Sequence, residues 1–368
     1  MKIAILGTRG VPARYGGFET LAEELGRRLV ARGHEVTVYG RTRFVDRTLD
    51  RHLGMRLVIL PAIGTKHLET VSHTLLSALH AARDGHDAAL VCNAANAPFV
   101  RLLQLASIPV ALNVDGLERK RRKWGPAGRI YYRLCERLAA TVADRLVTDA
   151  EVIRRYYGDR YGTPSEMIVY GGDVTAPEDD GELRRLGLEA GEYLLYVSRF
   201  EPENNPDRVA EAYARIGGDR PLVMLGEALY DRRLGRRLAE LAAADPRLRM
   251  PGAIYGDGYR QLLFGCRLYI HATEVGGTHP ALVEAMGAER PVLYHDTPEN
   301  REVAGEAGIG FRFDGAPALD EVVSAVVDDD DRLTELRAAS RRAVAARYRW
   351  DDVADAYERL LMGLGGLC

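Results

Sequence analysis

The residues best suited to chemistry lie in the stretch HATEVGGTHPALVEAMG, residues 271–287, which follows a short apolar run typical of a buried parallel strand. Gly276 and Gly277 let backbone N–H groups approach a ligand closely, because glycine has no Cβ in the way. Pro280 is typical of the first position of a helix, where unpaired N–H groups and the helix dipole favour a phosphate. Glu284, about one turn further along, adds a carboxylate.

Amides for an anion and a carboxylate for hydroxyl groups, one turn apart, suit a sugar nucleotide, with the diphosphate on the amides and the ribose on the acid. An ordinary strand-loop-helix corner with a solvated glutamate is the alternative that this stretch alone leaves open. A second glycine-rich loop, residues 7–17, ends in Gly16 and Gly17 before a predicted helix at 18–31. It is either another anion or sugar-hydroxyl site or a structural turn, and it lacks the G-x-G-x-x-G fingerprint of nicotinamide cofactors.

Strand-like and helix-like segments alternate along the whole chain, which predicts right-handed crossovers and parallel sheets. A chain of 368 residues is long enough for two domains. We therefore predict an α/β protein with two facing, Rossmann-like, doubly wound domains and a ligand cleft between them. The expected strands lie at 2–6, 35–40, 55–60, 88–92, 109–113, 145–147 and 167–173 in the first half, and at 193–197, 221–225, 248–250, 267–270, 291–294 and 308–311 in the second.

In such sheets ligands bind outside the carboxyl ends of the strands, and two polar residues occupy loops of this kind. Asp115 follows a predicted strand and either contacts substrate or, standing before Gly116, makes a turn. Arg199 leaves a strand end and suits a bidentate pair with a diphosphate. A salt bridge from Arg199 to Glu201 or Glu203 is the competing interpretation.

The most basic run of the chain, residues 118–124, precedes a predicted helix that carries Arg129, Arg133 and Arg137 beside apolar residues. This pattern indicates a solvated face, contact with an anionic membrane surface, or a site for a diphosphate-linked acceptor. Nucleic acid is disfavoured, because the net charge is −3 and no recognition motif accompanies the run. The aspartates at 328–331 are interpreted as a helix boundary, and no metal site is expected.

Four cysteines without C-x-x-C spacing predict reduced thiols and a cytoplasmic protein. No apolar run is long enough for a membrane span, and Met1 leads directly into a predicted strand, so no signal peptide is expected. Peripheral contact with the inner face of the plasma membrane, through residues 119–137, remains an option.

Four motifs in this order resemble the retaining, family 4 type glycosyltransferases of the GT-B fold, and more narrowly a bacterial rhamnosyltransferase-like branch: GTRGVPARYGGFET, NVDGLERKRRKW, SRFEPENN and EVGGTHPALVEAMG. The resemblance covers nearly the whole chain. It implies an acceptor-binding domain at residues 1–172, joined by a returning C-terminal helix at 350–368, and a nucleotide-sugar donor-binding domain at 173–349.

The resemblance also assigns roles. Arg199 matches the diphosphate-binding arginine, and Glu284 matches the ribose-binding second glutamate of the family's E-x7-E pair. The first glutamate of that pair falls at Gly276 and the superfamily's usual lysine at Asn204, so this sequence departs from the pattern. Glu274, or the backbone of residues 277–279, is expected to contact the transferred sugar instead.

Asp115 lies near the place where many relatives have a histidine beside the reacting sugar. The implied catalytic residues are Asp115, Arg199, Glu274 and Glu284. The implied acceptor-binding residues are Tyr15, Asp115, Arg119, Arg121 and Arg122. The implied donor-binding residues are Gly16, Gly17, Arg199, Asn204, Asn205, Gly252, Ile254, Gly276, Gly277, Thr278, His279, Ala281, Leu282 and Glu284. His271 and His279 are interpreted either as sugar contacts or as packed loop histidines.

The resemblance implies a hexosyltransferase of polysaccharide or glycoconjugate biosynthesis, with L-rhamnose from dTDP-rhamnose as the favoured donor and retained anomeric configuration. A UDP- or GDP-sugar donor is the alternative, and the acceptor is expected to be a glycan, a lipid-linked sugar or a small molecule. Neither a cofactor nor a metal is expected, since the nucleotide sugar is a co-substrate. A sugar-nucleotide epimerase, a non-catalytic nucleotide-binding regulator and a nicotinamide oxidoreductase are the rival classes, and fold analogy alone does not separate the first two from a transferase.

Overall fold

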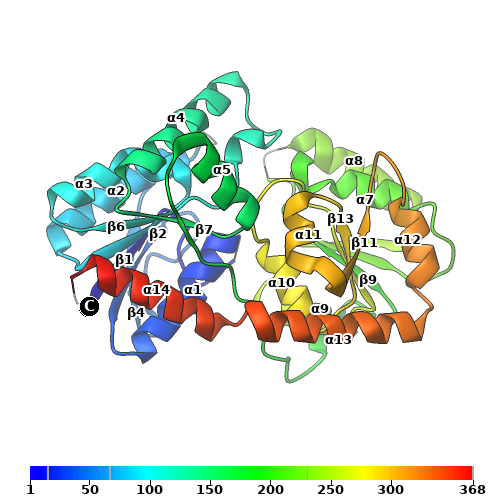
Figure 1. Ribbon diagram of the computed structural model, residues 1–368. Coiled ribbons are helices and arrows are strands. Elements are labelled where there is room, and N and C mark those ends of the chain that lie inside the picture. Colours follow the sequence, from blue (N-terminus) through cyan, green and yellow to red (C-terminus); the bar gives the residue numbers. More distant parts are fainter. Residues whose placement is uncertain (15, 66–67, 230, 367–368) are drawn as a thin grey trace. The chain divides into compact units, whose positions relative to one another are not determined.

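The computed structural model describes residues 1–14, 16–65, 68–229 and 231–366. The chain forms two compact units, Met1–Tyr170 with Trp350–Cys368, and Gly171–Arg349 (Figure 1). Each unit has a predominantly parallel sheet covered by helices, so the α/β architecture predicted from the alternating pattern is confirmed.

The sheet of the N-terminal unit has eight strands in the order β3-β4-β2-β1-β5-β6-β7-β8. Every neighbouring pair is parallel except the short β3 against β4. Because β1 lies between β2 and β5, the strand order reverses there, and the loop after β1 opens at the switch point. The strands are β1 (Lys2–Leu6), β2 (Glu35–Arg41), β3 (Arg51–His52), β4 (Met55–Leu60), β5 (Ala88–Cys92), β6 (Val110–Asn113), β7 (Arg145–Thr148) and β8 (Glu166–Met167).

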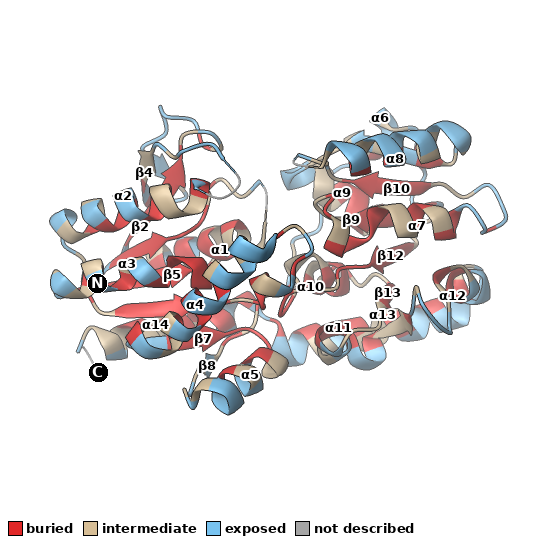
Figure 2. Cartoon of the chain, turned by 90° about the horizontal axis from the view of Figure 1, so that it is seen from above, coloured by how far each residue is buried: buried red, intermediate tan, exposed pale blue. Residues whose placement is uncertain are grey.

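Helices cover both faces of this sheet, as the alternation of side chains along β1 shows. Ile3 and Ile5 pack into a core shared with the first and last helices of the chain. Ala4 and Leu6 point to the other face and pack into a core shared with the other long helices of this unit. Figure 2 shows the strands as buried and the outer helix faces as exposed. The helices are α1 (Gly17–Ala31), α2 (Glu69–Asp84), η1 (Ala94–Asn96), α3 (Ala97–Leu105), η2 (Glu118–Lys120), α4 (Pro126–Val142), α5 (Glu151–Tyr161) and α14 (Trp350–Leu364).

Helix α14 belongs to this N-terminal unit although it ends the chain, and it lies beside α1 (Figure 1). Arg28 Nε is 2.9 Å from Asp351 Oδ1, and Arg32 Nη1 is 2.7 Å from Glu358 Oε2. On its buried side, the Tyr357 hydroxyl accepts a hydrogen bond from Asn113 Nδ2 at 2.7 Å. The last helix therefore holds the end of β6.

The C-terminal unit has a six-stranded, wholly parallel sheet in the order β11-β10-β9-β12-β13-β14, so its strand order reverses between β9 and β12. Its strands are β9 (Leu194–Val197), β10 (Leu222–Leu225), β11 (Leu248–Gly252), β12 (Leu268–His271), β13 (Val292–His295) and β14 (Gly308–Phe311). Its helices are α6 (Gly181–Arg185), η3 (Pro202–Asn204), α7 (Pro206–Tyr213), α8 (Arg232–Ala244), α9 (Gly256–Gly265), α10 (Pro280–Gly287), α11 (Pro298–Ala304), η4 (Gly305–Ala307), α12 (Leu319–Val326) and α13 (Asp330–Arg347).

The predicted strand at 167–173 is wrong beyond its first residue, because β8 ends at Met167. The following segment leaves the sheet and runs against α10. A Cβ on Gly287 would lie 1.6 Å from the Gly172 carbonyl oxygen, so this close approach of two backbones requires glycine. The Gly172 N–H donates instead to the Tyr348 carbonyl at 2.7 Å. Among the described residues, no helix is both long and apolar enough to cross a membrane.

Candidate functional site

The two loops that carry the predicted donor-binding residues meet at the switch point of the C-terminal sheet. Asn205, which follows η3, donates from Nδ2 to the Ala272 carbonyl at 2.9 Å and to Glu274 Oε1 at 3.0 Å. The Glu274 N–H donates to the Glu203 carbonyl at 2.9 Å. The loops after β9 and β12 are therefore joined into one structure at the edge where doubly wound sheets bind their ligands.

Arg199 stands at the start of the first loop on a fixed backbone. Its carbonyl accepts hydrogen bonds from Ser198 Oγ at 2.9 Å and from Asn204 Nδ2 at 2.6 Å. The side chain is 30% exposed, and its Nη1 lies 4.0 Å from Glu201 Oε1, at the outer limit for an ion pair. The ion pair with Glu201, one of the competing interpretations, is therefore present at the long end of the range, and the bidentate pairing of Arg199 with a diphosphate stays a prediction.

Asn204 and Asn205 are buried, and the structure gives their amide groups internal partners. Asn204 binds the Arg199 carbonyl, and Asn205, with a φ of 56°, binds Glu274. Left-handed backbone is tolerated by asparagine more readily than by most residues. Through Nδ2 these two side chains therefore position Arg199 and Glu274, whereas their buried Oδ1 atoms have no hydrogen-bond partner among the described residues, and the predicted contact with the donor stays a prediction.

Helix α10 begins at Pro280 with His279 as its N-cap, so residues 277–281 lie at the positive end of the helix. Gly276, Gly277 and Thr278 form the turn into it and are buried, while Ala281 is half-buried. The Leu282 side chain is fully buried and its N–H donates to the His279 carbonyl at 3.0 Å, and its predicted role in donor binding stays a prediction. The side chain supports the helix from the core.

The His279 imidazole fills the volume that a side chain at position 276 would need. A Cβ on Gly276 would lie 2.1 Å from His279 Cε1, well inside van der Waals contact. The His279 ring also packs on the ring of His271, with centroids 4.9 Å apart. The His279 ring can therefore occupy this position only because residue 276 is a glycine.

Glu284 lies one turn into α10, where the Tyr259 hydroxyl donates a hydrogen bond to its Oε2 at 2.8 Å. Burial, and then the charge of Glu284, raise the pKa of Tyr259 well above its usual range, so the phenol stays a donor. Tyr259 is not among the residues predicted from the sequence, because nothing local indicates that the hydroxyl of a residue on α9 reaches α10.

Gly252 and Ile254 lie at the carboxyl end of β11, which is on the same edge of the sheet but beyond β10 and β9. Gly252 has a φ of 93°, which turns the chain sharply after the strand. The Gly226 N–H donates to the Gly252 carbonyl at 3.2 Å, so the ends of β10 and β11 are held together.

In the N-terminal unit, acids of α1 hold the glycine-rich loop after β1. Glu19 Oε1 accepts the Arg9 N–H at 2.7 Å, and Glu23 Oε2 accepts the Ala13 N–H at 2.8 Å. Gly16 is the N-cap of α1 and Gly17 its first residue. Tyr15, predicted to bind acceptor, lies outside the described residues.

The basic run after β6 is not one exposed strip, so a solvated face, one of the three interpretations, describes only part of it. Arg119 Nε binds Glu136 Oε2 at 3.0 Å, and its Nη2 binds the Tyr156 hydroxyl at 3.0 Å. Arg121 is buried and pairs with Glu118, whereas Arg122 is exposed. Arg119 therefore fixes this loop on α4 and α5, and Arg121 pairs within the loop.

The aspartates at 328–331 form a helix boundary. Asp329 Oδ1 caps α13 by accepting the Arg332 N–H at 2.9 Å. Asp328 and Asp330 pair with Arg220 and Arg267, at 2.9 and 2.8 Å. The carboxylates of Asp328, Asp329 and Asp330 thus have structural roles.

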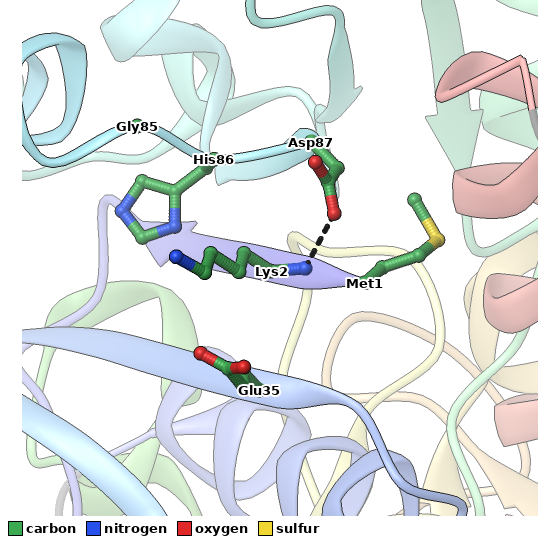
Figure 3. A pocket seen from close by; sticks show the side chains of 6 residues that line it. All are labelled: Met1, Lys2, Glu35, Gly85, His86 and Asp87. Carbon is green, nitrogen blue, oxygen red and sulfur yellow. Dashed lines mark hydrogen bonds between the residues drawn. The ribbon is translucent and has the colours of Figure 1, made fainter.

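A hollow of about 520 Å³ lies elsewhere on the N-terminal unit, and Figure 3 shows the side chains that line it. It lies at the amino ends of β1, β2 and β5, where the Lys2 N–H donates to Asp87 Oδ2 at 2.7 Å. This is the edge opposite to the one at which doubly wound sheets bind ligands, so we do not place the site there. Its lining residues are Met1, Lys2, Glu35, Gly85, His86 and Asp87.

Two buried histidines predict acid sensitivity of both units. Burial lowers the pKa of His73 to about 4, with a further contribution from Arg41, and burial beside His295 lowers the pKa of His271 to about 3. An unfolded histidine titrates near 6.5, so below that pH the unfolded chain binds protons that the folded chain does not. We expect the free energy of unfolding to fall from pH 6.5 towards pH 4, by up to about 1.4 kcal/mol per pH unit for each histidine.

Denaturant unfolding at several pH values would measure this slope. His73→Gln, which keeps a donor for the Gly40 carbonyl, is expected to flatten the slope of the N-terminal unit and to leave that of the other unit unchanged. Stability that stays constant between pH 6.5 and pH 4 would contradict the prediction.

Comparison with known proteins agrees with this geometry. Residues 15–170 match the model described as Glycosyltransferase Family 4, and residues 182–343 match the model described as Glycosyl transferases group 1. The chain is 26% identical, over 99% of both chains, to a GDP-mannose-dependent alpha-(1-6)-phosphatidylinositol monomannoside mannosyltransferase of Mycobacterium tuberculosis. Among solved structures, sucrose-phosphate synthase from Thermosynechococcus elongatus is 17% identical with a TM-score of 0.81 and full coverage of both chains. Anabaena HepE in complex with UDP-glucose is 17% identical with a TM-score of 0.75, covering 98% and 99%.

The fold and these matches define the chain as a glycosyltransferase of the GT-B fold. More particularly, it combines an N-terminal domain of glycosyltransferase family 4 with a C-terminal domain of the glycosyl transferases group 1.

Proposed function

We propose that this enzyme transfers a hexosyl group to a hydroxyl of a glycan, a lipid-linked sugar or a small molecule, with retention and without a metal ion. L-rhamnose from dTDP-rhamnose is the favoured donor, on the motif resemblance. The observation that carries the proposal is the junction of the Arg199 loop with the turn into α10 at the switch point. The names of the mannosyltransferase relatives favour GDP-mannose as the second candidate.

In the proposed mechanism, the sugar leaves as an oxocarbenium-like species while negative charge grows on the diphosphate. Arg199 and the amides at the start of α10 stabilise that charge, and Glu284 binds the ribose. Electrostatic groups already in place contribute most to such a step. The acceptor hydroxyl attacks from the same face and gives its proton to the departing phosphate. Asp115 orients that hydroxyl at the carboxyl end of β6.

Purified protein, screened by thermal shift with dTDP-rhamnose, UDP-glucose and GDP-mannose, tests the proposal, because a bound donor raises apparent stability. The stabilising donor is then incubated with lipid and glycan acceptors, with and without EDTA, and the product anomer is determined by NMR. We expect an acceptor-dependent product of retained configuration that EDTA does not reduce. Donor conversion without an acceptor would indicate an epimerase, and nucleotide binding without transfer would indicate a regulator.

We propose that His279 contacts the transferred sugar together with Glu274. His279 stands at the N-cap of α10, fixed between Gly276 and His271, and Glu274 is held by Asn205. His279→Ala is expected to lower kcat/KM for the donor sugar about 10-fold, the effect of one or two hydrogen bonds, and to leave the affinity for the nucleoside diphosphate unchanged. Calorimetric titration would measure the affinity for the nucleoside diphosphate, and initial rates would measure kcat/KM. Equal losses of affinity and of kcat/KM would mean that His279 contacts the phosphates and not the sugar.

We propose that the acceptor side of the N-terminal unit rests on an anionic bilayer through a surface that we call the α2–α4 face. Its members are large apolar side chains, each at least 38% exposed, on three successive neighbouring helices. Ile130 and Leu134, at 58% and 63%, stand beside three exposed arginines of α4, a charge pattern that complements acidic headgroups. The apolar members are Leu75, Leu76, Leu79, Leu105, Ile130 and Leu134.

Ile130→Ser combined with Leu134→Ser is expected to weaken binding to phosphatidylglycerol vesicles at least about 10-fold, since two apolar side chains lose their burial. Leu229→Ser removes an exposed leucine of the other unit and serves as the matched control. Co-sedimentation measures both variants. Equal binding of the double variant and the unaltered protein, or equal binding to neutral vesicles, would refute the proposal.

A further inference from the structure

Asp115 and a second aspartate, Asp149, occupy neighbouring strand ends in the N-terminal unit. Strands β6 and β7 are paired in parallel, with Asn113 opposite Val147. Asp115 lies two residues after Asn113, and Asp149 lies two residues after Val147. The two aspartates are therefore at the same height on the carboxyl edge of the sheet. This register brings the two carboxyl groups together, and a hydrogen bond from the Asp149 side chain contributes to lowering the pKa of Asp115.

The backbone is built to hold Asp115 in this place. Its φ is 52°, a left-handed conformation that costs energy for a residue with a side chain and that clusters at functional sites. The Asp115 N–H donates to Asn113 Oδ1 at 2.9 Å, and Asn113 Nδ2 donates to the Tyr357 hydroxyl of α14 at 2.7 Å. Helix α14 therefore supports the turn that presents this carboxyl group.

Two carboxyl groups in direct hydrogen-bond contact within a buried site share one proton, because like charges so close together cannot both ionise. Asp149 is fully buried, whereas Asp115 is half-buried. A charge is less costly on the more accessible group, so the proton belongs on Asp149. Burial raises the pKa of Asp115, and Glu118 raises it further, while the positive charge of Arg121, the Gly116 N–H and the hydrogen bond from Asp149 all lower it.

We propose that Asp149 is a positioning residue for the transfer reaction: its neutral carboxylic acid donates a hydrogen bond that orients the Asp115 carboxylate towards the acceptor hydroxyl. The inference rests on the proposed function of Asp115 and goes beyond it. Among the described residues, the groups coupled by charge to this pair also include Cys92 at the end of β5, Tyr170, and Tyr357 of α14. All three are uncharged at neutral pH, because burial raises the pKa of each well above its usual value.

The test compares Asp149→Ala with Asp149→Asn, since only asparagine keeps a donor for Asp115. Losing a hydrogen bond to a charged group is expected to lower kcat of the alanine variant about 10- to 100-fold. The asparagine variant is expected to recover at least about 10-fold of that loss, because a neutral donor is restored. Asp159→Asn on the exposed part of α5 is the matched control.

Equal losses for Asp149→Asn and Asp149→Ala would overturn the proposal, because they would mean that Asp149 acts through its charge or through its volume. The affinity for the nucleoside diphosphate, which is bound by the other unit, should stay unchanged in both variants. A fall in that affinity would also count against a positioning role.

Infrared difference spectroscopy gives a readout that does not depend on transferase activity. The unaltered protein at pH 7 should show the C=O stretch of a buried protonated carboxyl group, and Asp149→Asn should lack it. If this band is present but no acceptor is glycosylated, the proposed function is refuted, whereas the protonation of Asp149 is supported. If the band is missing, the inference fails whatever the enzyme transfers.

Discussion

An Arg199→Ala enzyme is expected to show a kcat/KM for the donor about 10² to 10³ times below that of the unaltered chain, the usual loss for one preorganised group facing developing charge. Arg199 stands on a backbone fixed by Ser198 and Asn204, so its position does not depend on the ligand. The lysine that the wider superfamily carries is replaced by Asn204, which is neutral. The guanidinium therefore supplies charge that no neighbouring lysine of this loop can replace.

Initial rates over a range of donor concentrations would measure this loss. Arg199→Lys should recover part of the activity, because it restores the charge but not the two-pronged hydrogen bonding. Arg237→Ala, which removes an exposed ion pair with Glu211 on the same unit, is the matched control and should leave turnover unaltered. Unchanged rates of the Arg199→Ala enzyme would show that the diphosphate of the donor does not bind at this loop.

A Glu284→Ala enzyme is expected to bind the nucleoside diphosphate about 10- to 100-fold more weakly, since hydrogen bonds between a carboxylate and ribose hydroxyls are lost. The Tyr259 hydroxyl, 2.8 Å from Glu284 Oε2, orients that carboxylate. Tyr259→Phe leaves the carboxylate in place but removes its orienting donor, so a smaller loss of affinity is expected in the same direction.

Calorimetric titration with dTDP, UDP and GDP would measure both variants, and circular dichroism would show that they fold. The combined variant should lose no more affinity than Glu284→Ala alone, because Tyr259 acts through Glu284. Additive losses would show that Tyr259 contacts the nucleotide itself. Unchanged affinity of Glu284→Ala would mean that the ribose lies elsewhere.

The pattern of the sequence was sufficient for the architecture and for part of the candidate site. Alternating apolar and helical segments predicted parallel sheets, and both sheets are present. The strand-loop-helix spacing around 271–287 likewise predicted β12, the glycine turn and α10 within a residue or two. These features depend on neighbours along the chain, which is the information that periodicity and local spacing contain.

The sequence was insufficient wherever the partner is distant along the chain. The basic run at 118–124 shows its charges but not that Arg121 is turned inward or that Arg119 reaches Glu136 of α4. The expected strand at 167–173 ends at Met167, because the segment after it crosses from the N-terminal unit to the C-terminal unit, where Gly172 lies against Gly287 of α10.

By itself, the sequence of this protein determined two doubly wound domains, and it placed an arginine and a glutamate where a nucleotide sugar is expected to bind. The tertiary structure alone decided that Asn205 ties Glu274 to the Arg199 loop, that His279 fills the volume beside Gly276, and that Asp149 meets Asp115. The physical reason is that each of these contacts depends on strand order or on the path of a loop, which bring together side chains that no local pattern relates.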